Sequence, residues 1–220
     1  MIKGERTILA DKRILFVSQR SWADTREQHL LVDMLAEHNE VIWINPFGGI
    51  GGALFPDMRM LKKRLTVYSP GINLLPLPAL RAFNNWRRLL QVKMYLLEKD
   101  FEPDLIVIDD PYALNFARHF KNKGQLVVYY AGADKTEIPP RSEEDRLAQA
   151  VDLVITASPD FYRRLKESGK AHLVKSESEY GGEELDEEEI GDEAVKAYME
   201  GLEARLEKIS AIIKKKLTRK

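Results

Sequence analysis

The sequence predicts an α/β protein with a Rossmann-like, doubly wound and mainly parallel sheet, in three α/β/α layers, followed by an amphipathic C-terminal helix. Three short apolar segments, residues 104–109, 125–130 and 152–157, are rich in β-branched side chains and end in small or polar residues. Apolar runs without alternation are typical of strands that a parallel sheet buries on both faces. Segments with helical spacing follow them, at residues 112–122, 142–150 and 160–168. This order predicts a βαβαβ unit.

The start of the chain predicts one more βαβ unit of the same type. Residues 13–18 and 40–45 are short apolar runs. Between them, residues 25–38 have apolar side chains at helical intervals. We expect these side chains to form a stripe that faces the sheet. The stripe consists of Leu30, Leu31, Met34 and Leu35.

The next part of the chain is less regular. Residues 46–55 contain four glycines, but these do not have the G-x-G-x-x-G spacing of a dinucleotide-binding loop. We therefore expect a surface loop over the ligand-binding side of the sheet. Residues 58–63 are predicted as a short basic turn, followed by short strands at residues 64–68 and 73–77.

Residues 80–100 predict a long helix with an apolar stripe. We expect the stripe to pack in the core and the basic residues to lie on an ordinary solvated face. The alternative is a basic face that contacts an anionic membrane surface. The stripe consists of Leu80, Phe83, Trp86, Leu90, Met94 and Leu97. The basic residues between them are Arg81, Arg87, Arg88 and Lys93.

Composition excludes several classes of function. The chain has no cysteine, which excludes disulfides and thiolate chemistry. Its four histidines are scattered along the chain, so we expect no metal site, and we expect no cofactor. A net charge of −1 gives no general attraction to nucleic acid, and we expect no nucleic-acid partner. No apolar run approaches the ~20 residues of a membrane span, and the start of the chain lacks a signal peptide. We expect a cytoplasmic protein, with peripheral contact to the inner face of the membrane as an open alternative.

The end of the chain changes in composition. We predict a domain over residues 1–175, an acidic linker over 176–191, and a C-terminal helix in 192–220. Residues 192–217 have one apolar face, with acidic residues toward the start and lysines toward the end, as a helix dipole favours. That face packs either on the domain or on a partner. Its spacing also fits a short coiled-coil seam, which would allow self-association.

Five segments of the chain carry a family resemblance: residues 18–29, 45–46, 103–109, 127–134 and 150–159. The most specific of them is the run Ala150-Val-Asp-Leu-Val-Ile-Thr-Ala-Ser-Pro159. Together they resemble the N-terminal half of a GT-B glycosyltransferase of the large, retaining, family-4-like group, and the resemblance covers about residues 13–175.

The resemblance implies a division of labour between two domains. In such enzymes the N-terminal domain receives the acceptor, the C-terminal domain holds the nucleotide sugar, and the final helix returns to the first domain. Residues 192–217 resemble that returning helix, and the acidic stretch at 176–189 stands where a donor domain would be. The implied partners are a glycan or lipid-linked acceptor, and a nucleotide sugar only if a donor domain is supplied.

The resemblance also implies that the loop after the first strand approaches the substrates. There, Gln19, Arg20, Ser21 and Trp22 replace the glycines that are usual in the family. Arg20 or Arg26 would supply positive charge for a phosphate. The alternative is that these arginines are surface ion-pair partners.

Further candidates follow the predicted strands. The resemblance places Asp134 beside the reacting sugar, where a carboxylate accepts hydrogen bonds or acts as a base; the alternative is a turn cap. Asp109, Asp110, Gly132 and Ser158 lie at the carboxyl ends of strands, where open α/β sheets bind ligands. The alternative for the two aspartates is that they cap the next helix.

Two functions remain open at this point. The first is the acceptor-binding half of a glycosyltransferase, which is not active alone. The second is a non-catalytic Rossmann-like module for binding or assembly, with the last helix as its docking element. Because one fold serves many functions, the fold alone does not decide between them.

Overall fold

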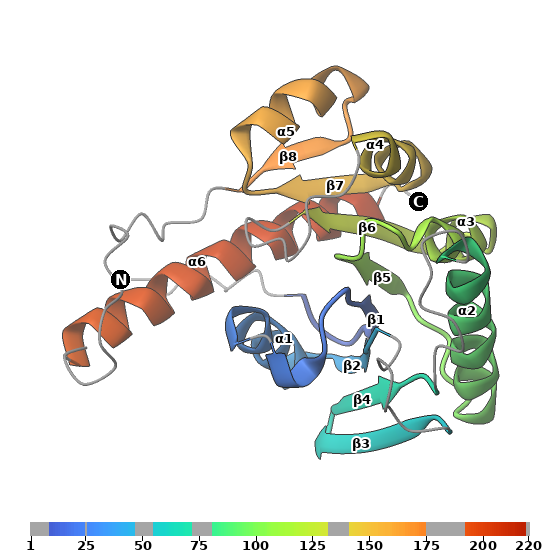
Figure 1. Cartoon of the computed structure of the whole chain (residues 1–220). Coiled ribbons are helices and arrows are strands. Elements are labelled where there is room, and N and C mark those ends of the chain that lie inside the picture. Colours follow the sequence, from blue (N-terminus) through green and yellow to red (C-terminus); the bar gives the residue numbers. More distant parts are fainter. Residues whose placement is uncertain are drawn as a thin grey trace.

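The computed structural model describes residues 9–24, 26–46, 55–71, 81–131, 141–174 and 192–218 (Figure 1). These residues form an eight-stranded sheet in the order β3-β4-β2-β1-β5-β6-β7-β8. Every pair of neighbours is parallel except β3 and β4. The predicted Rossmann-like, mainly parallel α/β fold is confirmed.

The elements have the following bounds. The strands are β1 (Arg13–Val17), β2 (Glu40–Ile44), β3 (Asp57–Lys62), β4 (Leu65–Ser69), β5 (Leu105–Ile108), β6 (Leu126–Ala131), β7 (Leu153–Thr156) and β8 (Ala171–Leu173). The helices are α1 (Arg26–His38), α2 (Arg81–Glu98), α3 (Leu114–Asn122), α4 (Arg141–Ala150), α5 (Pro159–Leu165) and α6 (Asp192–Leu217). Two short 3-10 turns are Trp22–Asp24 and Lys166–Ser168.

The central strands form because their apolar runs are buried on both faces. Every residue of β5, β6 and β7 is buried. The aspartates that precede β5 and β7 each bind the backbone of the adjacent strand. Asp104 Oδ2, before β5, accepts the N–H of Arg13 in β1 at 2.9 Å, and Asp152 Oδ2, before β7, accepts the N–H of Val127 in β6 at 3.0 Å. Each contact satisfies a backbone donor at a strand start, where the ladder provides no partner.

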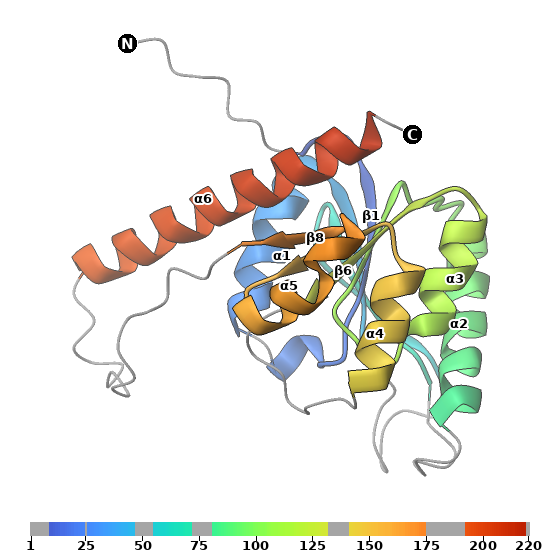
Figure 2. The same cartoon turned by 90° about the horizontal axis from the view of Figure 1, so that it is seen from above.

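The two faces of the sheet carry separate cores. The helices α2, α3, α4 and α5 cover one face, and α1 and α6 cover the other (Figure 2). In α6, Leu206, Ile209 and Ile213 are buried in the core on the face that α1 also covers. The first half of α6 extends beyond the sheet (Figures 1 and 2). The later part of the C-terminal helix thus packs on the body of its own chain.

The prediction of a basic turn at residues 58–63 was wrong. Residues Asp57–Lys62 form β3, which pairs antiparallel with β4 at the edge of the sheet. An edge strand has only one neighbour and needs no buried run, so it lacks the signal of the central strands. The predicted strand at 73–77, most of the glycine-rich segment and the predicted linker at 176–191 lie outside the described residues.

The predicted orientation of α2 was also wrong. The stripe expected in the core lies largely on the surface, with Phe83, Trp86, Met94 and Leu97 exposed. The buried face of α2 instead includes Arg88, which was expected in solvent. This helix is apolar on both faces, since Leu89, Val92, Tyr95 and Leu96 form the stripe that faces the sheet.

Candidate functional site

The carboxyl ends of four parallel strands meet at one edge of the sheet. The last residues of β1, β2 and β5 are in register, with Val17 beside Ile44 on one side and Ile108 on the other. In turn, Ile44 is in register with Tyr68 of β4. In open α/β sheets this edge is where ligands bind. We call this row of strand ends the carboxyl edge, as distinct from the edge strand β3. Along the carboxyl edge lie the loop of residues 18–24, Asn45, Ser69, Asp109 and Asp110.

Asp109 holds the loop that follows β1. Its Oδ1 accepts the backbone N–H of Gln19 at 2.7 Å, and its Oδ2 accepts the hydroxyl of Ser18 at 3.1 Å. The Oγ of Ser18 in turn accepts the backbone N–H of Arg20 at 3.0 Å. Three of the predicted site residues, Gln19, Arg20 and Asp109, are therefore brought together at the end of β1 and β5.

The environment of Asp109 changes its acidity. Burial raises the pKa of Asp109 to about 7, although hydrogen bonds from Gln19 and Ser18 and the charge of Arg88 oppose the rise, and the charge of Asp110 adds to it. A carboxyl group of this kind gains and loses its proton near neutral pH. Both oxygens of this carboxyl group accept hydrogen bonds from the loop, so its protonation state bears on how the loop is held.

Arg88 of α2 contacts the residues at the ends of three strands, β1, β2 and β5. Its guanidinium is buried and lies with Nη1 2.7 Å from Oδ2 of Asp110. Its Nη2 donates to the carbonyl of Ser18 at 2.6 Å and to that of Ile44 at 3.2 Å. Sequence reasoning missed this residue; the signal was its position on the helix face that also carries Val92 and Tyr95.

Asp110 is used fully by the fold. One oxygen binds Arg88, and the other accepts the backbone N–H of Tyr112 at 2.9 Å. This second bond closes the turn before α3, whose N-cap residue, Ala113, makes no side-chain cap. Both carboxylate oxygens of Asp110 thus have protein donors.

An aromatic cluster lies beside the loop. Oδ1 of Asn45 accepts the backbone N–H of Trp22 at 2.8 Å and the Nε1–H of Trp43 at 2.9 Å, and Nδ2 of Asn45 donates to Ser69 at 2.8 Å. The Trp22 ring stacks on His29, with ring centroids 3.9 Å apart, and meets Trp43 edge-on. Burial lowers the pKa of His29 and so favours its neutral form, although the backbone of Trp22 and the charge of Asp33 oppose the shift. The carboxyl edge therefore has an aromatic wall.

The remaining predicted residues are placed as follows. Ser158 follows β7, two strands from β5, and caps α5, since its Oγ accepts the backbone N–H of Phe161 at 3.3 Å. Ser21 begins the short 3-10 turn of the loop. Arg26 is the first residue of α1, and its side chain is not described. The predicted catalytic Asp134 and its neighbour Gly132 lie outside the described residues.

The described residues provide neither a metal site nor a membrane span. Among the described residues, no group of three or more histidine, aspartate or glutamate side chains is arranged to hold a metal ion. Within those residues, too, no helix has the length and apolar character needed to cross a bilayer.

Solved structures of other proteins are similar to this chain in fold. No family model and no curated protein matches the chain. A sucrose-phosphate synthase structure from Thermosynechococcus elongatus matches with a TM-score of 0.53 and 14% identity over 89% of this chain and 99% of that one. An α,α-trehalose 6-phosphate synthase from Burkholderia multivorans matches with a TM-score of 0.41 and 16% identity over 73% of this chain. A UDP-N-acetylglucosamine 2-epimerase matches with a TM-score of 0.49 and 12% identity over 74% of this chain.

The chain spans 43% of that trehalose 6-phosphate synthase and 48% of that epimerase. At these identities the likeness shows the fold alone. The chain therefore shares the fold of that sucrose-phosphate synthase structure.

Proposed function

We propose that this chain is the acceptor-binding half of a GT-B-type glycosyltransferase, which transfers a sugar from a nucleoside-diphosphate sugar and is inactive without a donor-binding domain. The observation that carries the proposal is the loop after β1, which Asp109 holds over the carboxyl edge of a sheet with this fold. Buried hydrogen bonds fix the backbone of this loop, while Gln19, Arg20, Ser21 and Trp22 keep part of their surface exposed.

The chemistry of the exposed part suits a sugar. Gln19 and Ser21 offer both donors and acceptors for hydroxyl groups, and Arg20 offers charge for a phosphate. The neutral aromatic surface of Trp22 suits the C–H groups of a sugar ring. We assign the catalytic carboxylate to Asp134 on the family resemblance, which puts an acidic residue beside the reacting sugar a few residues after this strand; in the sequence Asp134 is the third residue after β6.

The organisation of the chain supports the same proposal. The sucrose-phosphate synthase structure matches 89% of this chain and 99% of its own length. We infer the organisation that the sequence predicts: a domain at residues 1–175, a linker at 176–191 and a returning helix in 192–220. On this basis the chain takes a glycan or lipid-linked acceptor, and a nucleotide sugar binds only when a donor domain is supplied.

Thermal denaturation with two ligand panels tests the proposal. The first panel contains sugars, sugar phosphates and oligosaccharides, and the second contains UDP-, GDP-, ADP- and CDP-sugars. A ligand that binds only the folded chain adds about 2.7 kcal/mol at 100 times its Kd. We expect a rise in Tm with a member of the first panel alone. A rise with nucleotide sugars alone would contradict an acceptor site.

A matched pair of variants localises the effect. Trp22→Ala removes the ring but keeps the backbone N–H that binds Asn45, so it should lose the ligand-induced rise in Tm. Lys123→Ala changes an exposed residue after α3, far along the chain from the loop, and should keep it. Equal rises in both variants would place the ligand elsewhere.

The second function, a non-catalytic binding or assembly module, has one observation in its favour. The first half of α6 extends beyond the sheet (Figure 1), which leaves a length of helix for another chain. A Tm unchanged by both panels, together with a mass in solution that rises with concentration, would support this function over the acceptor site.

A further inference from the structure

The exposed apolar side chains of this protein are gathered on one flank. Among the residues that the structure describes, every large hydrophobic side chain that is exposed lies on α2, on β3 or just before β3. Single exposed apolar residues are normal, whereas a contiguous group marks a contact surface. The group consists of Phe55 (78% exposed), Met58 (43%), Met60 (69%), Leu61 (43%), Phe83 (51%), Trp86 (49%), Met94 (72%) and Leu97 (84%).

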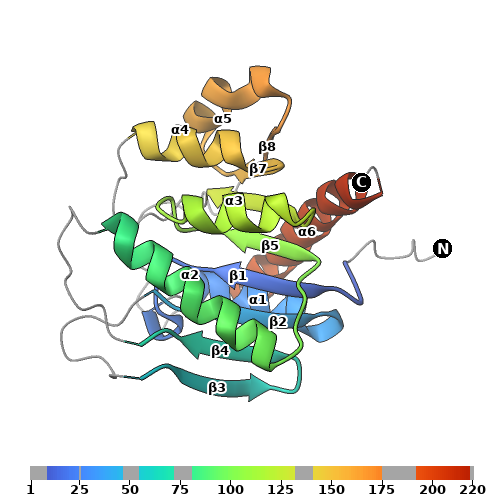
Figure 3. The same cartoon turned by 90° about the vertical axis from the view of Figure 1, so that its right-hand side faces the viewer.

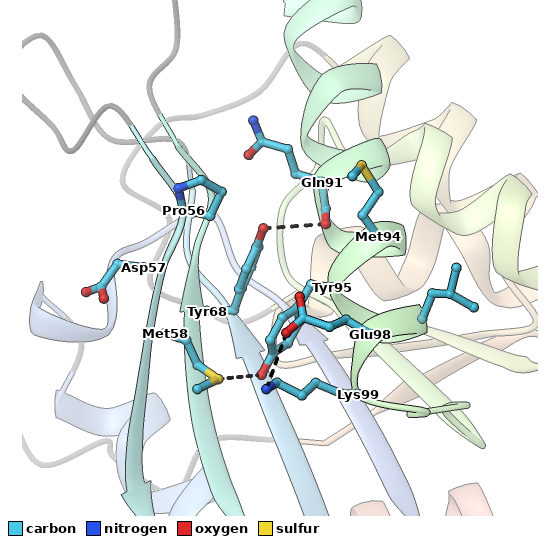
Figure 4. Close-up of a pocket in the computed structure, with 10 residues that line it drawn as sticks. Pro56, Asp57, Met58, Tyr68, Gln91, Met94, Tyr95, Glu98 and Lys99 are labelled. Carbon is cyan, nitrogen blue, oxygen red and sulfur yellow. Dashed lines mark hydrogen bonds and ion pairs between the residues drawn. The ribbon is translucent and has the colours of Figure 1, made fainter.

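The two elements form one continuous surface. The hydroxyl of Tyr95 on α2 donates to Sδ of Met58 on β3 at 3.1 Å, so the helix lies against the edge of the sheet (Figures 3 and 4). Met60 is two residues from Met58 and points to the same face of the strand. We call the surface formed by Met58, Met60 and the exposed stripe of α2 the apolar flank.

A hollow of about 590 Å3 lies within the apolar flank, between the β3–β4 hairpin and α2 (Figure 4). Its inner wall is a stacked pair, Tyr68 and Tyr95, with ring centroids 4.3 Å apart. The hydroxyl of Tyr68 donates to the carbonyl of Gln91 at 3.4 Å, so the polar end of this ring is satisfied by the protein. The residues around the hollow include Met58, Met94 and Leu97 of the apolar flank.

The charge around this surface is positive. Residues 55–71 and 81–99 contain nine lysines and arginines and two acidic residues, whereas the whole chain carries a net charge of −1. Of the nine, Arg88 is buried against Asp110 and Lys62 pairs with Asp33, and the other seven still outnumber the two acidic residues. Both acidic residues have a neighbouring cation: Asp57 lies 3.0 Å from Arg59, and Glu98 lies 3.6 Å from Lys99.

Two of the cations flank the exposed stripe of α2. At 3.6 residues per turn, Arg87 lies on one side of the stripe and Lys93 on the other. An apolar stripe with aromatic residues and basic borders is the pattern of helices that lie in the surface of a bilayer.

We propose that the apolar flank docks on the surface of an anionic phospholipid bilayer. In this position α2 lies along the bilayer with Phe83, Trp86, Met94 and Leu97 among the lipid headgroups, and its cations face anionic phosphates. Anionic lipid is favoured over an apolar protein partner because the cations border the stripe and their negative neighbours are already paired. Bound this way, the protein associates peripherally with the membrane through two surface elements, α2 and β3.

In the docked orientation the carboxyl edge lies close to the bilayer. Asn85 in the first turns of α2 donates to the carbonyl of Tyr112, two residues after Asp110, at 2.7 Å. The start of the docked helix is therefore next to the carboxyl edge. The inference stands on the apolar flank and is independent of the function proposed for that edge.

Vesicle co-sedimentation of the full chain tests the proposal. One set of vesicles contains phosphatidylcholine alone, and the other contains phosphatidylcholine mixed with phosphatidylglycerol. We expect sedimentation with the mixed vesicles, and weaker binding in high salt, since salt screens the attraction between exposed charges. Equal binding to both sets of vesicles, or no binding to the mixed set, would overturn the proposal.

Variants of α2 identify the surface. Trp86→Ser combined with Met94→Ser should weaken binding by about tenfold or more, because the apolar surface is lost. Lys93→Glu should weaken it by about fivefold or more, the effect of one cation near an anionic membrane. Lys208→Glu, which changes an exposed lysine on α6, on the opposite face of the sheet from α2, is the matched control and should bind like the parent chain.

Folding and self-association are checked on the same samples. An unchanged Tm in each variant shows that a loss of vesicle binding is not a loss of fold. Sedimentation velocity without lipid distinguishes a second copy as the occupant. A dimer that Trp86→Ser and Met94→Ser dissolve, with no binding to mixed vesicles, would overturn the proposal and assign the flank to self-association.

Discussion

Arg88 of α2 and Asp110 beyond β5 form a buried ion pair, with Nη1 2.7 Å from Oδ2 and side-chain exposures of 2% and 8%. The same guanidinium binds the carbonyls of Ser18 and Ile44. The contact therefore connects the helix layer to the ends of β1, β2 and β5. The loop that carries the candidate site rests on this connection.

Breaking this pair should destabilise the fold strongly. Removal of one partner of a buried ion pair costs about 3–5 kcal/mol, because the other charge is left without compensation. We expect Arg88→Met to lower the free energy of unfolding by this amount in urea titrations. Adding Asp110→Asn should recover part of the loss, since the uncompensated charge is then removed. Additive losses in the double variant would show that the two residues are not coupled.

The pH dependence of stability should report Asp109. Its folded pKa is raised from an ordinary value of 3.8 to about 7, so the folded chain holds this proton more tightly than the unfolded chain. The stability from this group is therefore present below about pH 4 and is lost as the pH rises through about 7. Relative to Asp109→Asn, the parent chain should lose at most about 1.4 kcal/mol per pH unit in this window.

Urea titrations at a series of pH values check this difference. The asparagine side chain can still accept the N–H of Gln19, so the variant should keep the loop in place. Parallel stability curves for both proteins between pH 4 and 8 would show that Asp109 ionises normally.

Ser158 separates a structural role from a binding role. Loss of an N-cap costs about 1 kcal/mol, so Ser158→Ala should lower the free energy of unfolding by that amount. Ser158→Asp keeps an acceptor for the N–H of Phe161 and should restore stability. Neither change should alter a ligand-induced rise in Tm, because Ser158 lies two strands from β5. A loss of ligand binding in Ser158→Asp at normal stability would instead assign it to the site.

The packing of α6 should contribute to the stability of the monomer. Ile209 is buried against the second face of the sheet, and truncation of a buried isoleucine to alanine costs about 2–5 kcal/mol. Lys215→Ala at an exposed position of the same helix is the control. We expect Ile209→Ala to lower the Tm equally at low and high protein concentration. A loss that depends on concentration would indicate that α6 is exchanged between copies.

The central strands could be predicted because burial on both faces leaves uninterrupted apolar runs such as β5 and β7. The start of α5 was also predicted, since Ser158 and Pro159 form a local cap. The face of α2 could not be predicted in the same way. Both faces are apolar, and which of them is buried depends on contacts with distant strands.

The candidate site was partly predictable for the same reason. Parallel strands bring their carboxyl ends to one edge, so the meeting of Gln19 with Asp109 follows from the order of elements. The roles of Asn45 and Arg88 depend on side-chain geometry between segments that are far apart in sequence. No spacing along the chain indicates such contacts.

The acceptor site is tested most directly by amide NMR spectra of the isotope-labelled chain during titration with the sugar and sugar-phosphate panel. An acceptor that binds at the carboxyl edge should shift the amides of Gln19, Arg20 and Trp22 and leave that of Lys215 unchanged. Under the same conditions, nucleotide sugars should leave the loop amides unchanged. Loop amides that respond to nucleotide sugars and to no member of the sugar panel would contradict the proposed acceptor-binding function.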